Sequence, residues 1–406
     1  MKVLVLNSGS SSQKSRLYEI GDTLPASPPC CTWEGKIEFG DGKAQYSIKT
    51  TSGVSRNGEA PATSRGEAIE YLLQSLWSGD APAISAPSEI DVVGHRVVHG
   101  GPHYFEPTVV TAEVKLAIEG VSDFAPLHNR AELQGMETVA KLIGPVKQVA
   151  VFDTGFHRNM PSSSVVYPGP YEWFERGIRR YGFHGINHEY CAQRAAQMLG
   201  RDLAKLKLVT CHLGNGCSLA AIRDGRSVDT TMGFTPLEGL MMGTRSGSVD
   251  PGILTYIMRH DKLSGEQLDD VLNQKSGLLG VSGLSGDMRE ILASATGGHE
   301  RAKLAFEIYV HRLQSGIGAM VAVVGGIDAL IFTAGVGENS PDVRAAVCNN
   351  FSFLGLKLDQ AKNAQMSADN DADLSAPDVA VKALMIHAQE DWMIAQKCWS
   401  LMQMAM

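Results

Sequence analysis

The chain has 406 residues, of which 44% are hydrophobic and 20% are charged, and its formal net charge is −8. This length exceeds one ordinary hydrophobic core and predicts two domains or one large α/β unit. The acidic balance argues against a nucleic-acid or anionic-membrane partner, because such surfaces are bound through a basic field.

Cysteine usage and the shortness of the apolar segments predict a cytoplasmic protein. The seven cysteines are odd in number and lack paired C-x-x-C spacing, which is typical of free thiols in a reducing compartment. No stretch reaches 18 uninterrupted apolar residues, and the N-terminus has the pattern of a strand. We therefore expect neither a signal peptide nor a membrane-spanning helix.

The first predicted element is a buried strand over residues 3–6, followed by the polar run NSGSSSQK. A short continuous apolar run is typical of a strand buried on both faces. Asn7, Ser10 and Ser12 then offer small polar groups in a turn, with Lys14 nearby, and such a turn suits a phosphate. A linker or a plain hairpin is the alternative, because the run matches neither standard glycine-rich phosphate loop.

The rest of the first half is predicted to contain strands first and then alternating helices and strands. Residues 27–53 have the turn signals of an antiparallel meander. Helical spacing follows over residues 66–77, 111–120 and 130–144, and buried strands are expected within 90–97 and 147–152.

The same order recurs in the second half of the chain. Residues 207–233 predict a buried strand, an Asn/Gly turn that ends at Ser218, and two further strands. An internal duplication near residues 1–150 and 205–385 is therefore expected, with chance similarity of two strand-turn-strand units as the alternative. A long helix over 299–324 leads to a buried strand and a glycine-rich loop over 333–339, after which Ser340 and Pro341 are expected to start another helix.

Three strands thus run into small polar turns, at residues 7–12, 212–218 and 333–339. In open α/β sheets, ligands bind where strands end at their carboxyl edge. Three such turns facing one ligand favour the phosphate interpretation of the opening run over the linker.

Two arginines and two acids are the charged candidates for chemistry. Arg245 lies in the glycine-rich stretch 228–252, and long irregular loops of this kind are usually functional. Its planar fork suits a phosphate or a carboxylate, although a structural ion pair is the alternative. Arg96 follows a predicted strand, and Asp153 and Glu390 also follow apolar strands, where carboxylates commonly hold magnesium. A helix cap or surface acid is the alternative, above all for Glu390.

Among the histidines, His184 is the preferred functional candidate. It immediately precedes a predicted helix whose expected N-cap is Asn187, and this places the imidazole near a pocket. The HRVVH and HGINH stretches lack the glutamate of H-E-x-x-H, so we expect no zinc site there.

With these motifs in order, the chain resembles the acetate kinase (acetokinase) family of the actin-like, sugar-kinase-like ATPase superfamily. The stretches that carry the resemblance run essentially from end to end: NSGSSS, HRVVHGG, APLHN, VFDT, YGFHG, HLGNG, MGFTPLEGLMMGTRSG and FTAGVGENS. The resemblance implies two duplicated actin-like (ribonuclease H-like) α/β domains, with mixed central sheets flanked by helices and ATP in the cleft between them. It implies boundaries at 1–153 plus 391–406 for the N-terminal domain and 154–390 for the nucleotide-binding domain, and it also implies a homodimer.

The resemblance also implies roles for individual residues. The catalytic group would be Arg96, Asp153, His184 and Arg245. Asn7 and Glu390 would support Mg²⁺, with Mn²⁺ as the alternative metal. The pocket for acetate would contain Arg96, Val98, Leu127, Phe183 and Pro236. ATP would be bound by Ser10, Ser12, Lys14, His212, Leu213, Gly214, Asn215, Gly216, Asp287, Arg289, Gly335, Val336, Gly337, Glu338 and Asn339.

The chain departs from the family pattern at several positions. Residues 387–391 read HAQED where the family usually has PTNEE, which places the geometry of Glu390 in question. Polar Gln13 and Ser15 replace apolar residues, and Arg130 replaces a proline. None of these changes removes a residue that the resemblance assigns to catalysis.

The implied reaction is reversible in-line transfer of the ATP γ-phosphoryl group to acetate, which gives acetyl phosphate and ADP. Propionate or butyrate kinase activity is the close alternative, because one methylene gives only ~1–3 kcal/mol of discrimination in an apolar pocket. A non-catalytic ATP-dependent actin-like binding protein is the remote alternative, and it would need an appended peptide-binding or polymer surface.

Overall fold

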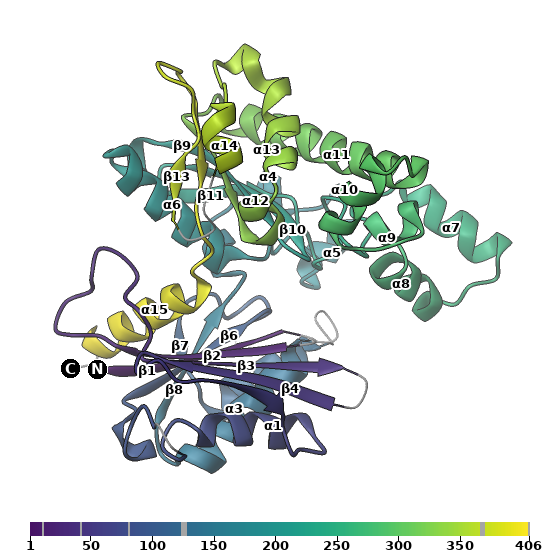
Figure 1. Ribbon diagram of the computed structural model, residues 1–406. Helices are drawn as coiled ribbons and strands as arrows, with labels where there is room; N and C mark the ends of the chain where they lie inside the picture. Colours follow the sequence, from purple (N-terminus) through teal and green to yellow (C-terminus); the bar gives the residue numbers. More distant parts are fainter. Residues whose placement is uncertain (10–11, 41–42, 80–81, 123–127, 366–369, 405–406) are drawn as a thin grey trace. The chain divides into compact units, whose positions relative to one another are not determined.

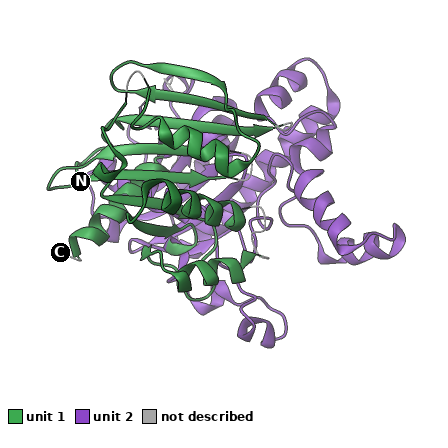
Figure 2. Ribbon diagram, turned by 90° about the horizontal axis from the view of Figure 1, so that it is seen from below, with its two compact units in different colours: residues 1–155, 389–406 green, residues 156–388 purple. Residues whose placement is uncertain are grey.

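The computed structural model describes residues 1–406 except 10–11, 41–42, 80–81, 123–127, 366–369 and 405–406. The chain forms two compact units, shown in Figure 2. Unit 1 comprises residues 1–155 and 389–406, and unit 2 comprises residues 156–388. The chain therefore crosses between the units twice, and its last segment returns to the unit that contains the N-terminus.

Unit 1 is built on a mixed sheet with the order β5-β4-β3-β2-β1-β6-β8-β7. The first five strands form an antiparallel meander, and β1 pairs in parallel with β6, which pairs in parallel with β8. Residues 3–6 of β1 are fully buried, as expected for a central strand covered on both faces. The strands are β1 (Lys2–Ser8), β2 (Ser12–Glu19), β3 (Trp33–Gly40), β4 (Lys43–Thr50), β5 (Ser55–Glu59), β6 (Val92–Val97), β7 (Thr108–Val109) and β8 (Lys147–Phe152).

Helices cover both faces of this sheet, with α15 on one face and α1 and α3 on the other (Figure 1). Side chains of β1, α1 and α3 share one hydrophobic core that includes Leu6, Leu72 and Val139. On the opposite face α15 packs closely on Gly94 of β6, where a Cβ would lie 2.6 Å from the Cys398 sulfur. The helices are α1 (Arg65–Gln74), α2 (Ala112–Gly120), α3 (Asn129–Ile143) and α15 (Glu390–Met404), with a 3₁₀ turn at Pro87–Glu89.

Unit 2 contains a second mixed sheet with the order β11-β10-β9-β12-β14-β13. The central strand β9 pairs antiparallel with β10 and parallel with β12, and β12 pairs parallel with β14. Its strands are β9 (Lys207–Leu213), β10 (Cys217–Arg223), β11 (Arg226–Thr230), β12 (Ala329–Thr333), β13 (Ala372–Asp373) and β14 (Lys382–Met385).

The long helix α11 (Glu300–Val324) packs on the strands of this sheet, and Leu313 and Ile317 are among its buried residues. The remaining helices are α4 (Ser162–Val165), α5 (Glu172–Glu175), α6 (Gly185–Leu199), α7 (Pro251–His260), α8 (Gly265–Gln274), α9 (Gly277–Ser282), α10 (Met288–Thr296), α12 (Ala334–Asn339), α13 (Pro341–Cys348) and α14 (Gln360–Gln365). Turns of 3₁₀ type lie at Gly155–His157, Leu203–Lys205 and Asn349–Leu354. No helix among the described residues is long and apolar enough to cross a membrane.

The two sheets repeat one strand plan, which confirms the predicted duplication. β2-β1-β6-β8 in unit 1 has the same pairing senses as β10-β9-β12-β14 in unit 2. The predicted start of α13 is also confirmed, since the Ser340 hydroxyl accepts from the Val343 N–H and Pro341 is the first helical residue.

Two local predictions were wrong. Residues 334–339 form the short helix α12 and not an open loop. Asn187 does not cap α6, because the helix already begins at Gly185 and Asn187 is fully buried within it. His184 occupies the N-cap position in a left-handed conformation, with φ of 57°. The helix after the YGFHG turn therefore has its N-cap three residues earlier than the preference of asparagine for N-caps predicts.

Candidate active site

The opening polar run forms the β1–β2 hairpin of unit 1. Asn7 pairs with Lys14 across the two strands, and the Gly9 N–H donates to the Ser12 carbonyl at 2.8 Å. Arg65 of α1 donates to the Gly9 carbonyl at 2.8 Å and to the Ser12 carbonyl at 3.4 Å. Lys14 is exposed, whereas Ser10 lies outside the described residues. The main chain at Gly9 and Ser12 is therefore fastened to α1 by a guanidinium, which a slack linker would not need.

Gln13 and Ser15, two departures from the family pattern, point into the unit from β2. Both are buried, and the Ser8 hydroxyl donates to the side-chain Oε1 of Gln13 at 2.5 Å. The Gln13 amide in turn contacts the Lys14 carbonyl and the Ser15 hydroxyl, at 3.3 and 3.4 Å. The polar replacements thus satisfy one another, as buried polar groups must.

The start of α15 brings two carboxylates to the end of β1. The Asn7 amide donates to Glu390 at 3.2 Å and to Asp391 at 2.9 Å. Glu390 is the first residue of the helix, and Asp391 is buried beside Arg16, 3.4 Å away. Burial raises the pKa of the Asp391 carboxyl. The HAQED replacement therefore leaves the contact between Asn7 and Glu390 in place.

Arg96 and Asp153 form a buried ion pair at the ends of β6 and β8. The guanidinium donates to the Asp153 Oδ2 at 2.6 Å and to the Ser8 carbonyl at 3.4 Å. Asp153 is fully buried, and its Oδ1 has no hydrogen-bond partner among the described residues. The Arg96 Nε is likewise buried without such a partner. Orphaned buried polar atoms on both members of the pair indicate a site that is completed by a ligand.

The oxygen chemistry of these residues fits a hard divalent cation. Asn7, Asp153 and Glu390 all offer oxygen ligands, which Mg²⁺ prefers. No cluster of three or more His, Cys, Asp or Glu side chains suited to a metal occurs in the part of the chain that the structure describes. A site of one or two carboxylates, finished by water and substrate phosphates, is how magnesium is usually held in phosphoryl-transfer enzymes.

In unit 2, His184 belongs to a network of hydrogen-bonded and stacked imidazoles. Its Nδ1 lies 2.9 Å from the Ser218 hydroxyl, which also lies 2.7 Å from the His188 Nε2. Burial lowers the pKa of His188 well below its usual value, so that ring is neutral. The left-handed backbone of His184 is uncommon outside glycine, and such strain is concentrated at functional positions.

His212 is held against His184 and aimed at the glycine turn after β9. The two rings stack at 3.9 Å with only 9° between their planes. Asn187 donates to the His212 Nδ1 at 2.8 Å, so the ring proton resides on Nε2. A Cβ on Gly214 would lie 3.4 Å from that Nε2. His212 thus presents an N–H donor to the turn, as binding of a phosphate requires.

Arg245 and His184 converge on Gly216. A Cβ on this glycine would lie 3.3 Å from the His184 Nε2 and 3.6 Å from the Arg245 guanidinium. Arg245 also donates to the Pro236 carbonyl at 3.3 Å, and burial lowers the pKa of its guanidinium from the usual value. Both side chains therefore lie next to the α-carbon of Gly216, where a larger residue would crowd them.

A cavity of about 600 Å³ lies beside this turn within unit 2. Seven of the residues predicted for ATP line it, and they come from the turn after β9, the start of α10 and helix α12. Its wall also contains Met288, Leu292 and Pro341, which offer apolar contact to a flat ring. The seven predicted residues are Gly214, Asn215, Asp287, Arg289, Gly335, Val336 and Asn339.

Of the unit 2 residues predicted for ATP, five do not line this cavity: His212, Leu213, Gly216, Gly337 and Glu338. Leu213 is fully buried, so its side chain belongs to the core. The Glu338 carboxylate accepts from the Ala334 N–H at 2.7 Å and from the Ala388 N–H at 2.9 Å. Glu338 therefore holds the start of α12 and the end of unit 2.

The residues predicted for the acetate pocket are distributed over both units. Val98 in unit 1 and Phe183 in unit 2 are buried, with exposed fractions of 2% and 1%. Pro236 in unit 2 is half-buried and contacts Arg245 through its carbonyl group. Leu127 lies outside the described residues.

Sequence reasoning missed two polar residues in these surroundings. Asn187 was assigned a capping role but instead fixes the tautomer of His212. Glu132 of α3 was not singled out, although its carboxylate is buried and receives the Val98 N–H at 3.1 Å. A signal for Glu132 was present, because it shares the buried stripe of its helix with Asn129, Met136 and Val139.

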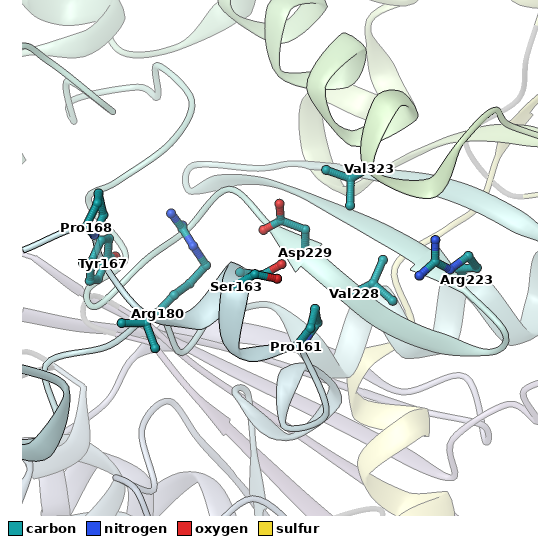
Figure 3. Close-up of a pocket in the computed structure, with 11 residues that line it drawn as sticks. Pro161, Ser163, Tyr167, Pro168, Arg180, Arg223, Val228, Asp229 and Val323 are labelled. Carbon is teal, nitrogen blue, oxygen red and sulfur yellow. The ribbon is translucent and has the colours of Figure 1, made fainter. Parts of the chain in front are cut away.

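A second cavity in unit 2, of about 540 Å³, has none of the predicted site residues in its wall. Figure 3 shows Asp229, Ser163 and Arg223 around it, with Val228 and Val323 as apolar neighbours. Arg180 also lines it, but its guanidinium is committed to Glu238 at 2.7 Å and to two carbonyl groups.

Comparisons with known proteins agree with this geometry. Residues 2–396 match the model of the acetokinase family. The chain is 58% identical to an acetate kinase of Cyanothece sp., over 99% of both chains, and 57% identical to an acetate kinase of Gloeobacter violaceus, over 98% of this chain and 99% of that one.

Solved structures give the same result. The crystal structure of Porphyromonas gingivalis acetate kinase superimposes with a TM-score of 0.90 at 39% identity, over 99% of both chains. A propionate kinase from Francisella tularensis gives a TM-score of 0.88 at 34% identity, over 98% of this chain and 99% of that one. The duplicated α/β sheets are therefore those of the actin-like ATPase fold, and the chain belongs to the acetokinase family.

Proposed function

We propose that this protein is an acetate kinase, which reversibly transfers the γ-phosphoryl group of ATP to acetate in a magnesium-dependent reaction. The observation that carries the proposal is the convergence of Arg245 and His184 on Gly216, next to Asn215 in the wall of the nucleotide cavity. A guanidinium and an imidazole at that point suit a phosphoryl group in transit, which carries its charge on three equatorial oxygens. Formation of acetyl phosphate, trapped as its hydroxamate, tests the proposal.

Residues of both units bind the substrates and stabilise the charge that develops during transfer. The nucleotide cavity and the His212 donor bind ATP and its phosphates, with Asp287 and Arg289 at the cavity wall. Arg96, already paired with Asp153, orients the carboxylate of acetate. Because a carboxylate is already ionised at neutral pH, Asp153 acts as an organiser and not as a general base. Arg245 and His184 stabilise the charge of the phosphoryl group in flight.

A divalent cation would be held by Asn7, Asp153 and Glu390, with ATP phosphates and water completing its shell. When bound, it neutralises charge on the phosphates. Family membership supports a divalent metal and the oxygen ligands favour Mg²⁺. Asn7 positions the Glu390 carboxylate by its direct hydrogen bond.

Propionate kinase activity is the second candidate, because a solved propionate kinase shares the fold at 34% identity over nearly the whole chain. Acids that differ by one methylene are separated by only ~1–3 kcal/mol in an apolar pocket. A direct comparison of acetate, propionate and butyrate under the same conditions distinguishes the candidates.

We also propose that the protein is a homodimer, as its resemblance to the family implies. Sedimentation equilibrium should give twice the chain mass of 43.6 kDa. A mass of one chain across the micromolar range would contradict this assembly.

A further inference from the structure

Glu132 is a buried acid to which the proposed reaction assigns no role. It lies on α3 at 1% exposure, in the helix stripe that faces the core. Burying an ionisable side chain costs free energy unless it is paired or neutralised. A glutamate on such a stripe therefore calls for a specific partner.

The partners of Glu132 are on the acetate side of the proposed site. Its two carboxyl oxygens lie 3.2 and 3.1 Å from the Val98 nitrogen, so the carboxyl group accepts the N–H that follows β6. The charged groups that act on it are Arg96 of β6, Asp153 at the end of β8 and Arg65 of α1. Arg65 also donates to the carbonyl groups of Gly9 and Ser12.

We propose that Glu132 is a positioning residue that holds Val98 and sets the charge balance around Arg96, and thereby the affinity for the acid substrate. This inference rests on the proposed function, because it assigns the substrate carboxylate to Arg96. Glu132 does not touch substrate in this scheme and acts only through Arg96 and the main chain of Val98.

The charge balance around Arg96 depends on the state of Glu132. With a neutral Glu132, the acidic groups that act on the Arg96 guanidinium are Asp153 and Glu390, and the guanidinium retains attraction for a substrate carboxylate. With an ionised Glu132, a further carboxylate acts on the same guanidinium, and the substrate anion binds less well. Burial, the largest cause, raises the pKa of Glu132 to about 8, against the opposing effect of Arg96. The neutral form therefore dominates below that pH and the ionised form above it.

The test compares the wild type with E132Q, E132A and the control E137Q, which changes an exposed acid on the same helix. Glutamine keeps an acceptor for the Val98 N–H and cannot ionise, whereas alanine removes both properties. KM for acetate, KM for ATP and kcat are measured from pH 6.5 to 9.5 with magnesium-ATP.

The wild type and E137Q should lose affinity for acetate as pH rises through about 8. Their KM for acetate should be roughly tenfold higher at pH 9.5, because repulsion between ionised Glu132 and the bound carboxylate that changes a pKa by about one unit changes binding about tenfold. E132Q should show a flat KM for acetate over this range, and KM for ATP should stay within about twofold in every variant. E132A should raise KM for acetate at all pH values, by about tenfold for the lost buried hydrogen bond.

A purely structural role would lower kcat and stability without separating the two KM values. E132Q with the pH profile of the wild type, in an active enzyme, would overturn this inference alone. A wild type that forms no acyl phosphate would overturn the proposed function and this inference with it.

Discussion

At the scale of single residues, the site depends on side chains whose charge or tautomer is set by a neighbour. Asn187 leaves the His212 proton on Nε2, and Asp153 holds the Arg96 guanidinium in a buried ion pair. Both arrangements orient donors before any ligand arrives. Preorganised donors are the largest source of electrostatic stabilisation in transfer reactions, because they need no rearrangement at the moment of reaction.

Replacement of Arg245 tests the positive charge that its guanidinium is proposed to supply to the phosphoryl group. R245A should reduce kcat on the order of 10³-fold, by analogy with arginine fingers, while KM for ATP changes little. The matched control is R259A, which removes an exposed arginine of α7. Steady-state kinetics with acetate checks the prediction, and a kcat loss below tenfold in R245A would rule out the role.

At the scale of elements, the irregular segment between β11 and α7 is held in place by main-chain hydrogen bonds. The Met242 N–H donates to the Arg245 carbonyl at 3.1 Å, and the Ser276 N–H donates to the Thr244 carbonyl at 2.9 Å. Gly277 has φ of 62° and no room for a side chain, since a Cβ would lie 2.2 Å from the Met242 carbonyl. These main-chain contacts hold Arg245 in place without regular secondary structure.

Gly243 connects this segment to the cavity that we propose for the nucleotide. A Cβ there would lie 2.9 Å from the Gly286 carbonyl and 3.0 Å from the Asn215 side chain, both of which belong to cavity-lining residues. G243A should therefore raise KM for ATP by about tenfold, the typical effect of overpacking a close contact. G265A is the control, because its Cβ would meet no atom within 4 Å. Equal KM values for ATP in the two variants would contradict this packing argument.

The sequence was sufficient to predict most elements, because their signals are local. The apolar run of β1, the helical spacing of α3 and the Ser340–Pro341 start of α13 all appear where their patterns indicate. Failures occurred where tertiary contact overrides local chemistry. Asn187 is a residue type that is favoured at N-caps, yet its side-chain amide donates to His212 and Thr333 within the unit.

The site was predictable to the extent that its residues lie in turns after strands. Gly214, Asn215 and Gly335 follow β9 and β12 and line one cavity, as the strand-end rule indicates. Glu338 lies in the same motif but faces Ala334 and Ala388, and no sequence pattern distinguishes these two orientations. Glu132 is the converse case, because it is a helix position for which we propose a functional role although no motif marks it.

At the scale of the whole molecule, both units contain buried histidines whose protonation opposes folding. Burial, the largest cause in each case, lowers the pKa of His95, His99 and His157 to about 4. His95 and His99 lie in unit 1, and His157 lies in unit 2, where its Nε2 donates to the Phe183 carbonyl. Acid therefore weakens both units through the same chemistry.

The sign of this pH effect follows from linkage. The unfolded histidines titrate near 6.5, so stability is complete above that pH and declines as pH falls toward 4, where the folded rings also protonate. Each ring should cost about 2 kcal/mol of unfolding free energy at pH 5 relative to pH 7.5. Urea unfolding of H95Q should show a smaller decline than the wild type, whereas the exposed-site control H103Q should match the wild type. An unchanged slope in H95Q would contradict the assignment.

The most direct test of the central claim is a hydroxamate assay with magnesium-ATP that compares acetate, propionate and butyrate at matched concentrations, with R245A alongside. We predict the highest kcat/KM with acetate and a loss of turnover in R245A on the order of 10³-fold. A longer acid ahead of acetate would identify a sister kinase of the family. No acyl phosphate from any of the three acids would contradict the account.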